Sequence, residues 1–477
     1  MEHGGVTLFP VDAFPADRLA ALDDSGQVLS YGDLAQISMR LASSVRARTV
    51  ALVLVRNTLG CVATIVALIK QGVVPILLDA SAAPATIALH RERYQPDVLV
   101  LPSDLQAQYP DNPCLLRMLD YAVLASENQA SRCPTHPDLA LLISTSGSTG
   151  SPKLVRQSRG NVLSNAQAIA SYLNIGPGDR PVTSLPLHYT YGFSVLSSHL
   201  QVGATLLVTD RSVMEKPFWT FIKEAGATSL AGVPYTYQML KRLGFLRANP
   251  GSLHTLTQAG GKLSDALVRE FAEFAARSGI DFYVMYGQTE ATARMSYVPA
   301  GRALDKAGSI GVAIPGGELF LVDSEGGEIN AADVQGELGY RGPNVTMGYA
   351  EQRADLSTGD ERRGTLLTGD LALRDADGYY YITGRLSRIA KLFGKRVSLD
   401  DLEQICLGLV TEVACTGAED RVTVWVTDCE HTAALSGLLA ERTAIHASAY
   451  QVRLIDSLPR TPVGKTDYRL LSSRMQA

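Results

Sequence analysis

The stretch LALLISTSGSTGSPKLV, residues 139–155, decides the fold. It opens with a short apolar run at residues 139–143, which predicts a buried strand. Hydroxyls and glycines follow, and Pro152 and Lys153 end the loop. The next apolar residues stand at helical spacing and predict a helix that stops before Gly176. They are Val162, Ala166, Ile169, Ala170 and Leu173.

The composition of this loop is typical of a phosphate-binding site. Glycines let backbone N–H groups turn toward an anion, and hydroxyls add further donors. Lys153 adds a mobile positive charge. A Walker loop is excluded, because that motif needs glycine directly before its lysine and Pro152 stands there. From the loop alone, a plain surface turn stays an equally open interpretation.

The length and composition of the chain limit the number of domains and the class of protein that can be expected. A chain of 477 residues exceeds one ordinary core, so two or more domains are expected. With 19% charged and 46% apolar residues and a net charge of −5, it reads as a soluble globular protein and not as a nucleic-acid binder. No apolar run approaches the roughly 18 residues of a membrane span. The first residues lack the basic start and apolar core of a signal peptide, so none is expected.

Cysteines and histidines show no metal-binding pattern. The eight histidines are scattered, so no zinc site is expected. The six cysteines also lack metal spacing and predict reduced thiols in a cytoplasmic protein. They are Cys61, Cys114, Cys133, Cys406, Cys415 and Cys429.

The first part of the chain alternates helix and strand signals. Ser30 can cap a helix, with Asp33 answering three residues later. Strands are expected at residues 50–55 and 73–78, with an amphipathic helix between them that ends at Gly72. This alternation predicts a layered α/β domain.

One histidine, His188, stands among three aromatic side chains in PLHYTYGF, residues 186–193. Taken alone, such a histidine is more often packed and hydrogen-bonded than catalytic. Short strands are expected at residues 206–208 and 230–233.

Residues 282–286 predict a strand that runs directly into Thr289 and Glu290. A hydroxyl and a carboxylate just past a strand end are well placed for a ligand in an α/β sheet. Glu290 could hold Mg²⁺, which prefers oxygen ligands. The alternative is an acid that offsets a helix dipole.

Glycine-punctuated segments at residues 336–342 and 347–349 predict a small β-rich region. Residues 367–370 and 379–382 flank a turn and are hairpin-like. The window 384–396 is the most basic in the chain, which indicates either a solvated face or contact with phosphates. It contains Arg385, Arg388, Lys391, Lys395 and Arg396 and no acid.

Taken together, these blocks resemble the AMP-forming adenylating superfamily of acyl- and aryl-CoA synthetases, nonribosomal peptide adenylation domains and firefly-type luciferases. The resemblance covers nearly the whole chain, and its motifs occur in family order. They are Leu-Ser-Tyr-Gly-Asp-Leu at 29–34, Thr-Ser-Gly-Ser-Thr-Gly-Ser-Pro-Lys at 145–153, Tyr-Gly-Gln-Thr-Glu at 286–290, Gly-Glu-Leu at 336–338, Thr-Gly-Asp at 368–370, Gly-Arg at 384–385 and Pro-Val-Gly-Lys at 462–465.

The resemblance implies an α/β fold in two domains. Residues 1–385 would form a large N-terminal domain of layered α/β subdomains with a small β-rich subdomain. Residues 386–477 would form a small, mobile α+β domain that carries the catalytic lysine. The implied reaction has two halves: a carboxylate attacks the α-phosphate of MgATP to give an acyl-adenylate and pyrophosphate, and a thiol then displaces AMP.

The attack brings two anions together, so positive charge must gather at the α-phosphate. By resemblance, Lys465 is the mobile catalytic lysine that bridges the substrate carboxylate and the phosphate. Thr289 contacts the α-phosphate, and Glu290 binds Mg²⁺. His188 counts with these catalytic residues, at the carboxylate end of the acyl pocket.

The resemblance also implies the groups that hold ATP and the acid. Asp370 would accept hydrogen bonds from both ribose hydroxyls, Arg385 would reach the ribose, and Tyr286 would lie against adenine. The full cofactor-binding set is Thr145, Ser146, Gly147, Ser148, Thr149, Gly150, Lys153, Gly260, Gly261, Tyr286, Gly287, Gln288, Asp370 and Arg385. The expected substrate pocket comprises His188, Tyr189, Tyr191, Gly192 and Val233.

Three positions depart from the family pattern. Gly192 stands where amino-acid-activating domains carry an aspartate for the substrate ammonium, so an acyl, aryl or hydroxy acid is favoured over an α-amino acid. Ser387 stands at the hinge position, which is usually aspartate or lysine. Lys262 follows two glycines where alanine is common.

Three functions follow, two enzymatic and a third from a different class. The leading one is an ATP-dependent acid–thiol ligase that makes acyl-CoA. The second is a freestanding adenylation enzyme that loads the phosphopantetheine thiol of a separate acyl carrier protein. The third is a non-catalytic nucleotide-binding homologue, against which the presence of Lys465, Glu290 and Asp370 argues. No nucleic-acid or membrane partner is expected.

Overall fold

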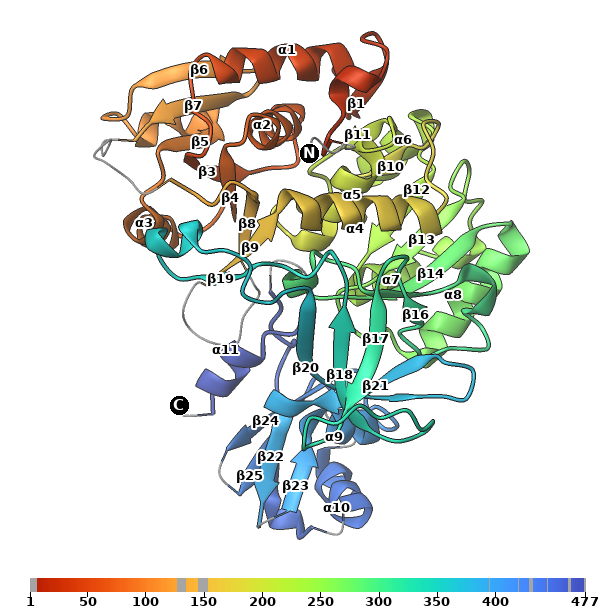
Figure 1. The fold of residues 1–477 in the computed structure, drawn as a ribbon. Helices are drawn as coiled ribbons and strands as arrows, with labels where there is room; N and C mark the ends of the chain where they lie inside the picture. The colour runs from red at the N-terminus through yellow and green to blue at the C-terminus, as the bar shows by residue number, and fades with distance from the viewer. Residues whose placement is uncertain are drawn as a thin grey trace. The chain divides into compact units, whose positions relative to one another are not determined.

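The computed structural model describes residues 7–126, 134–144, 153–393, 395–418, 420–428, 432–443, 445–461 and 465–475 (Figure 1). The chain divides into two compact units. Unit 1 comprises Met1–Glu318 and Arg341–Leu366, and unit 2 comprises Leu319–Tyr340 and Leu367–Ala477.

Unit 1 contains a nine-stranded sheet whose central strands are parallel. Its strands are, in spatial order, β16 (Val312–Ala313), β15 (Ser296–Val298), β14 (Asp281–Tyr286), β13 (Thr255–Gln258), β12 (Ser229–Gly232), β10 (Pro181–Val182), β11 (Leu206–Val208), β1 (Leu19–Asp23) and β2 (Val28–Ser30).

A second, eight-stranded sheet also belongs to unit 1. Its strands are, in spatial order, β19 (Gly348–Ala350), β9 (Leu154–Ser158), β8 (Leu139–Ser144), β4 (Val74–Asp79), β3 (Val50–Val55), β5 (Val98–Pro102), β7 (Tyr121–Ala125) and β6 (Cys114–Met118).

The α-helices of unit 1 pack on and between these sheets (Figure 1). They are α1 (Tyr31–Ala42), α2 (Leu59–Lys70), α3 (Pro84–Tyr94), α4 (Arg159–Tyr172), α5 (Thr190–Leu200), α6 (Lys216–Glu224), α7 (Pro234–Arg242) and α8 (Asp265–Ser278). Every residue of α5 is buried, and its apolar side chains enter the cores of both sheets.

Unit 2 contains a four-stranded sheet and a three-stranded sheet. The first joins β17 (Glu318–Val322), β18 (Gly336–Arg341), β20 (Thr365–Arg374) and β21 (Tyr380–Arg385), and the second joins β24 (Val413–Ala418), β25 (Arg421–Val426) and β26 (Tyr450–Leu454). The hairpin of β22 (Ile389–Leu392) and β23 (Lys395–Ser398) and the helices α9 (Leu399–Cys406), α10 (Thr432–Thr443) and α11 (Tyr468–Ser473) complete it. The domain boundary expected near residue 386 stays a prediction.

Local sequence signals explain several of these elements. Ser30 accepts a hydrogen bond from Asp33 N, and the Asp33 carboxylate answers at Ser30 N, which is the predicted capping box of α1. The strands expected near residues 50–55 and 73–78 are confirmed as β3 and β4. The predicted hairpin is confirmed as β20 and β21, which pair antiparallel.

Three local predictions were wrong. The helix expected to be amphipathic, α2, is buried from Leu59 to Ile69, because it packs against α1 on one side and strands on the other. The strand β9 stands between the glycine-rich loop and α4, so that loop joins two antiparallel strands. Residues 348–350 form β19 and extend the eight-stranded sheet of unit 1 instead of joining the small β-rich region.

Across the described residues, no helix combines the length and the apolar character that a membrane crossing requires.

Candidate active site

The carboxyl end of β14 leads into a tight turn that carries the predicted catalytic groups. A Cβ added at Gly287 would lie 1.7 Å from the carbonyl oxygen of Ala293. Glycine therefore lets the chain fold back on itself, so that Met295 N donates to Tyr286 O over 2.9 Å. The short 3₁₀ helix Thr289–Ala291 sits in this return. Backbone contact thus fixes the position of Thr289.

Thr289 is also tied to the start of α5. Its hydroxyl oxygen lies 3.0 Å from that of Thr190, the first residue of the helix. Its carbonyl accepts a hydrogen bond from Gln157 Nε2 in β9 over 3.4 Å. Three elements that are distant in sequence, β9, the start of α5 and the return after β14, therefore meet at Thr289.

Glu290 is held from both its main chain and its side chain. Its carbonyl accepts from Thr346 N at 3.0 Å and from the Thr346 hydroxyl at 2.9 Å. Its carboxylate accepts from the Tyr349 hydroxyl at 2.7 Å. Burial, with Glu290 beside it, raises the pKa of Tyr349 to about 12, so the phenol stays a donor. A positioned carboxylate of this kind suits Mg²⁺.

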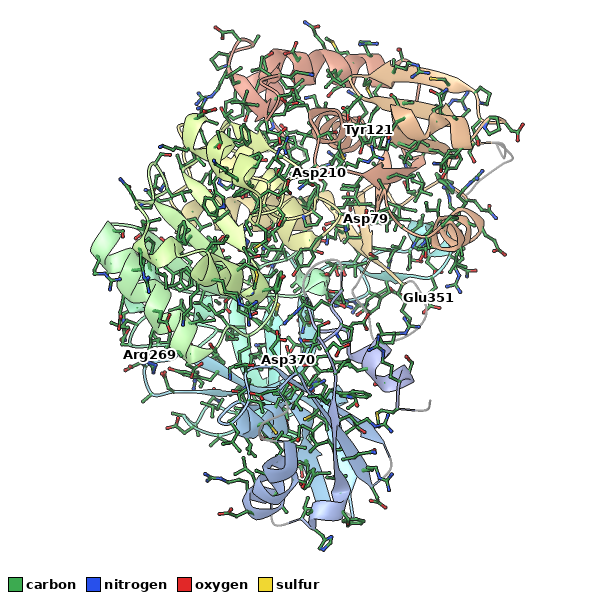
Figure 2. All side chains as sticks on the ribbon, turned by 180° about the vertical axis from the view of Figure 1, so that it is seen from behind. Asp79, Tyr121, Asp210, Arg269, Glu351 and Asp370 are labelled. Atoms are coloured by element: carbon green, nitrogen blue, oxygen red, sulfur yellow. The ribbon has the colours of Figure 1, made fainter. Side chains whose placement is uncertain are left out.

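Lys153 lies in the same polar cluster. Its Nζ is 2.8 Å from Oε1 of Glu351, which Figure 2 labels, and 5.8 Å from the centre of the Tyr349 ring. Arg362 lies over the same ring at 4.8 Å. The other predicted phosphate-loop residues, Thr145, Ser146, Gly147, Ser148, Thr149 and Gly150, lie outside the described residues.

A buried arginine, Arg156, holds the segment that carries Tyr349 and Glu351. Its Nε donates to Tyr349 O at 2.9 Å and its Nη2 to Met347 O at 3.1 Å. It also binds the carbonyls of Thr358 and Gly359 and the carboxylate of Glu361. No role for Arg156 was predicted from the sequence. A charge inside a short apolar strand was the available signal, but it does not say which distant carbonyls it binds.

His188 lies near two acids. Its Nε2 is 3.8 Å from Oδ2 of Asp79, the last residue of β4, and Asp210 is also close enough to act on it. Figure 2 labels both acids. Burial nevertheless lowers the pKa of His188, so the ring is neutral near pH 7. Its Nδ1 is buried and has no hydrogen-bond partner among the described residues. An imidazole with an unused nitrogen agrees better with a ligand-contacting residue than with a fully satisfied core residue.

Part of the predicted pocket converges at the carboxyl ends of β12 and β13, and β13 lies between β12 and β14. Gly260 has φ +83°, and a Cβ there would lie 2.5 Å from the Tyr189 hydroxyl and 3.1 Å from Cγ1 of Val233. Gly261 lies against Pro234, and its carbonyl accepts from Gln258 Nε2 at 2.9 Å. These groups lie at the carboxyl ends of parallel strands, which is where a ligand is expected in such a sheet.

Two other predicted pocket residues are packed in the core. Tyr191 is 4% exposed, and its hydroxyl donates to the Thr257 carbonyl at 3.0 Å. A Cβ on Gly192 would lie 2.2 Å from Pro186 O. Packing therefore explains the glycine at this position, because an aspartate side chain here would collide with the main chain of Pro186. A role for either residue in contacting substrate stays a prediction.

His199, on α5, makes the stability of unit 1 depend on pH. It is 4% exposed, its Nδ1–H donates to Val195 O at 2.8 Å, and burial lowers its pKa to about 4. Its folded pKa lies below the unfolded value, so its contribution to stability is present above pH 6.5 and is lost as pH falls toward 4. We expect the free energy of unfolding to fall by about 3 kcal/mol over this range from this residue.

Denaturant unfolding at a series of pH values measures this effect. The variant His199→Gln should show a flatter pH dependence, whereas His446→Gln, at an exposed position, should match the wild type. An unchanged slope in His199→Gln would contradict the assignment.

In unit 2, Asp370 and Arg385 face each other across the β20–β21 pair. Asp370 is 2% exposed, and its Oδ1 lies 2.7 Å from Arg385 Nε. The preceding residues shape this position, because the Thr368 hydroxyl donates to Leu338 O at 2.8 Å and Gly369 has φ +73°. The two side chains expected at the ribose are thus adjacent, with the carboxylate oriented by the guanidinium.

The main chain of Lys465, in unit 2, is hydrogen-bonded to Thr461. Thr461 N donates to Lys465 O at 2.7 Å, and Lys465 N donates to the Thr461 hydroxyl at 3.2 Å. Arg460 and Thr466 form an antiparallel bridge beneath it. The rest of the predicted motif, Pro462 to Gly464, lies outside the described residues.

The basic window 384–396 is only partly the solvated or phosphate-facing surface that sequence analysis expected. Arg388 pairs with Asp400 and Glu403 and lies 3.8 Å from the centre of the Tyr468 ring. It anchors α9 and α11 and is not available to a ligand. The side chains of Lys391, Lys395 and Arg396 lie outside the described part.

Comparisons with known proteins agree with this geometry. A family model described as AMP-binding enzyme matches residues 10–350. Indoleacetate–CoA ligase of Aromatoleum aromaticum is 29% identical over 355 residues, which cover 71% of this chain and 68% of that protein. Sulfoacetate–CoA ligase of Cupriavidus necator is 30% identical over 362 residues, covering 72% and 69%.

Solved structures share the fold. The o-succinylbenzoate CoA synthetase of Bacillus subtilis, in complex with its acyl-adenylate, has a TM-score of 0.78 at 23% identity and covers 97% of this chain and 96% of its own. ATP-bound MatB of Rhodopseudomonas palustris has a TM-score of 0.80 at 22% identity and covers 99% of each chain.

Proposed function

Because this chain belongs to the AMP-binding enzyme family, we propose that it activates a carboxylic acid with MgATP and transfers the acyl group to a thiol. The observation that carries the proposal is the convergence at the carboxyl end of β14. Thr289 and Glu290 are fixed there by main-chain contacts, beside Thr190 and within one polar cluster with Lys153 and Tyr349.

The residues present fit MgATP. Glu290 offers a positioned carboxylate of the kind that Mg²⁺ takes, and Lys153 follows a loop rich in glycine and hydroxyl groups. The bound metal supplies charge neutralisation at the phosphates. In unit 2, the paired Asp370 and Arg385 offer an acceptor and a donor that suit ribose hydroxyls.

The chain's own residues then have distinct tasks. The Thr289 hydroxyl donates to the α-phosphate. The neutral His188 contacts the substrate carboxylate without bringing a positive charge to it. Lys465 reduces the repulsion between carboxylate and phosphate. These roles, and a hinge near residue 386 that brings Lys465 to its place, are parts of the proposal.

The proposed acceptor is coenzyme A, since the curated relatives are named as CoA ligases. Their acids range from aromatic acetates to small acids with two acidic groups, so their names leave the acid of this chain open. A separate acyl carrier protein is the alternative acceptor. A cytoplasmic location suits the free thiols of Cys61, Cys114, Cys406 and Cys415.

Carboxylate-dependent exchange of pyrophosphate into ATP tests the first half-reaction without any thiol. A panel of aryl, short-chain, medium-chain, dicarboxylic and amino acids should give exchange with one class. Product formation with coenzyme A and with a carrier bearing phosphopantetheine then identifies the acceptor. ATP binding without exchange for any acid in the panel would favour the non-catalytic homologue.

A further inference from the structure

Arg362 is a half-buried cation beside Tyr349. Its Cζ lies 4.8 Å from the centre of the Tyr349 ring, and the hydroxyl of that ring donates to the Glu290 carboxylate at 2.7 Å. The guanidinium also acts on this hydroxyl, because burial and Glu290 raise the pKa of Tyr349 to about 12 and Arg362 opposes that rise. Arg362 and the carboxylate that is expected to bind Mg²⁺ therefore contact the same tyrosine.

The guanidinium of Arg362 differs from the other two cations of this region in having no acid as partner. Lys153 lies 2.8 Å from Glu351, which Figure 2 labels, and Arg156 is paired with Glu361. Among the described residues no ion pair joins Arg362 to an acid, and its Nη1 is buried without a hydrogen-bond partner. Buried donors are normally paired, so this nitrogen indicates that a group from outside the chain completes its hydrogen bonds.

Two further acids near Arg362 are engaged by other groups. Asp360 Oδ1 accepts from the main-chain N of Arg362 at 2.9 Å and from that of Arg363 at 3.0 Å. Glu290 accepts from the Tyr349 hydroxyl and is the expected ligand of Mg²⁺. Neither carboxylate is paired with the Arg362 guanidinium, so the described residues leave this positive charge for an anion that the chain does not supply.

The main chain holds Arg362 from both sides. Before it, Glu361 N donates to Met347 O at 3.0 Å, and the Glu361 carboxylate binds the buried Arg156. After it, Thr365 N donates to Arg362 O at 3.1 Å. A cation whose main chain is held in this way loses less conformational freedom when it binds a ligand than one on a free loop.

From this arrangement we infer that Arg362 binds the terminal phosphates of ATP and the pyrophosphate that leaves. The inference rests on the proposed function, because it assumes that Glu290 takes the Mg²⁺ of MgATP. Mg²⁺ held by a carboxylate usually also binds phosphate oxygens of the nucleotide, which brings those phosphates beside Tyr349. A guanidinium suits them, because its planar set of N–H donors matches phosphate oxygens.

This position gives Arg362 a different task from Lys465. In the proposed adenylation step, an oxygen of the carboxylate bonds to the α-phosphorus, and the bond from that phosphorus to the oxygen that bridges to the β-phosphate breaks. The electron pair of the broken bond goes to pyrophosphate. Arg362 stabilises the charge on this leaving group, whereas Lys465 acts between the two anions that join.

Binding of ligands that differ in their phosphates tests the inference without any acid substrate. Isothermal titration calorimetry with Mg²⁺ gives the Kd of ATP, of AMP and of pyrophosphate for the wild type and for Arg362→Met, which keeps the length of the side chain but not its charge. We expect the Kd of ATP and of pyrophosphate to rise by ~10–10²-fold, the scale for losing a hydrogen bond to a charged group, and the Kd of AMP to change by less than about threefold. Equal losses for ATP and AMP would assign Arg362 to packing and contradict the inference.

Two further variants separate binding by Arg362 from a general effect of charge. Arg362→Lys should retain part of the affinity for ATP, because it keeps the charge but not the planar set of donors. The matched control Arg363→Met removes the neighbouring, exposed arginine and should bind ATP like the wild type. Equal losses in Arg363→Met and Arg362→Met would show that net charge, and not binding by Arg362, is responsible.

Coenzyme A also carries phosphates, so its binding is measured in the same series. Arg362→Met should bind coenzyme A like the wild type, and a loss confined to coenzyme A would overturn the inference. Single-turnover kinetics give a second readout. Adenylation in Arg362→Met should slow by ~10–10²-fold, and thiol transfer from a preformed acyl-adenylate should be unchanged, because no pyrophosphate takes part in that step.

Thermal melting without ligand shows whether each variant is folded. If Arg362→Met does not fold, Arg362→Lys decides: weaker binding of ATP with unchanged binding of AMP supports the inference, and unchanged binding of both overturns it. Unchanged ATP affinity in folded Arg362→Met would remove the inference and leave the proposed function intact. A wild-type protein that binds none of ATP, AMP and pyrophosphate would remove both together.

Discussion

Replacing Lys465 by alanine is expected to slow adenylation by ~10²–10³-fold or more, the scale for removing a preorganised charge at a developing anion. The two reacting groups, a carboxylate and a phosphate, repel each other, and a cation between them stabilises the transition state. Thiol transfer from a preformed acyl-adenylate should be spared, because that step no longer joins two anions.

The loop geometry makes this test specific. The main chain of Lys465 is tied to Thr461 from both sides, so truncating the side chain leaves the loop bonds in place. Single-turnover kinetics of each half-reaction measure the two effects separately. Lys241→Ala, which removes an exposed lysine paired with Glu270 at 2.8 Å, is the matched control and should leave both steps unchanged. Near-normal adenylation in Lys465→Ala would overturn the assignment.

Replacing Gly287 by alanine is expected to lower adenylation by ~10²-fold or more, although the added methyl group carries no chemistry. The new Cβ would stand 1.7 Å from Ala293 O, and because the Cβ is bonded directly to the backbone and the oxygen is a backbone atom, the turn itself must move. Thr289 and Glu290 sit inside that turn. Displacement of reacting groups by about 1 Å is enough for a loss of this size.

The matched control is Gly301→Ala, in the same unit, where an added Cβ meets nothing within 4 Å. It should retain wild-type exchange and melting temperature. Gly287→Ala should melt lower, since the misplaced backbone also disturbs the bond from Met295 N to Tyr286 O. Wild-type exchange and melting in Gly287→Ala would show that the turn is not as tightly fixed as the contacts indicate.

Sequence reasoning located most elements because their signals are local. The capping box at Ser30 and Asp33 needs only two residues that stand three positions apart. The turn between β20 and β21 can be predicted from its glycine and aspartates. The strand β9 was missed because LVRQS is short and contains a buried arginine whose partners lie about two hundred residues away. Likewise, nothing local indicates that α2 is enclosed on every side.

In the candidate site too, the sequence predicts residues that belong to local motifs but not the contacts between distant residues. Thr289, Glu290, Asp370 and Arg385 were expected from motifs, and the contacts that orient them were not. Tyr349 beside Glu290 and Thr190 beside Thr289 are pairings across 59 and 99 positions, which a single sequence does not reveal. Gly192 shows another contact that the sequence does not reveal, because the nearby Pro186 carbonyl gives this glycine a packing reason, while the selectivity inferred from it stays a prediction.

Arg156 sets a limit on how such chains can exchange parts during evolution. The family model ends at residue 350, but this arginine binds the carbonyls of Thr358 and Gly359 and the carboxylate of Glu361 beyond it. A crossover between relatives near residue 350 would pair the arginine of one parent with the loop of another. Losing its partners would strand a buried charge, at a cost of about 3–5 kcal/mol. We therefore expect a chimera joined between strand β9 and Glu361 to be less stable than one in which both come from the same parent.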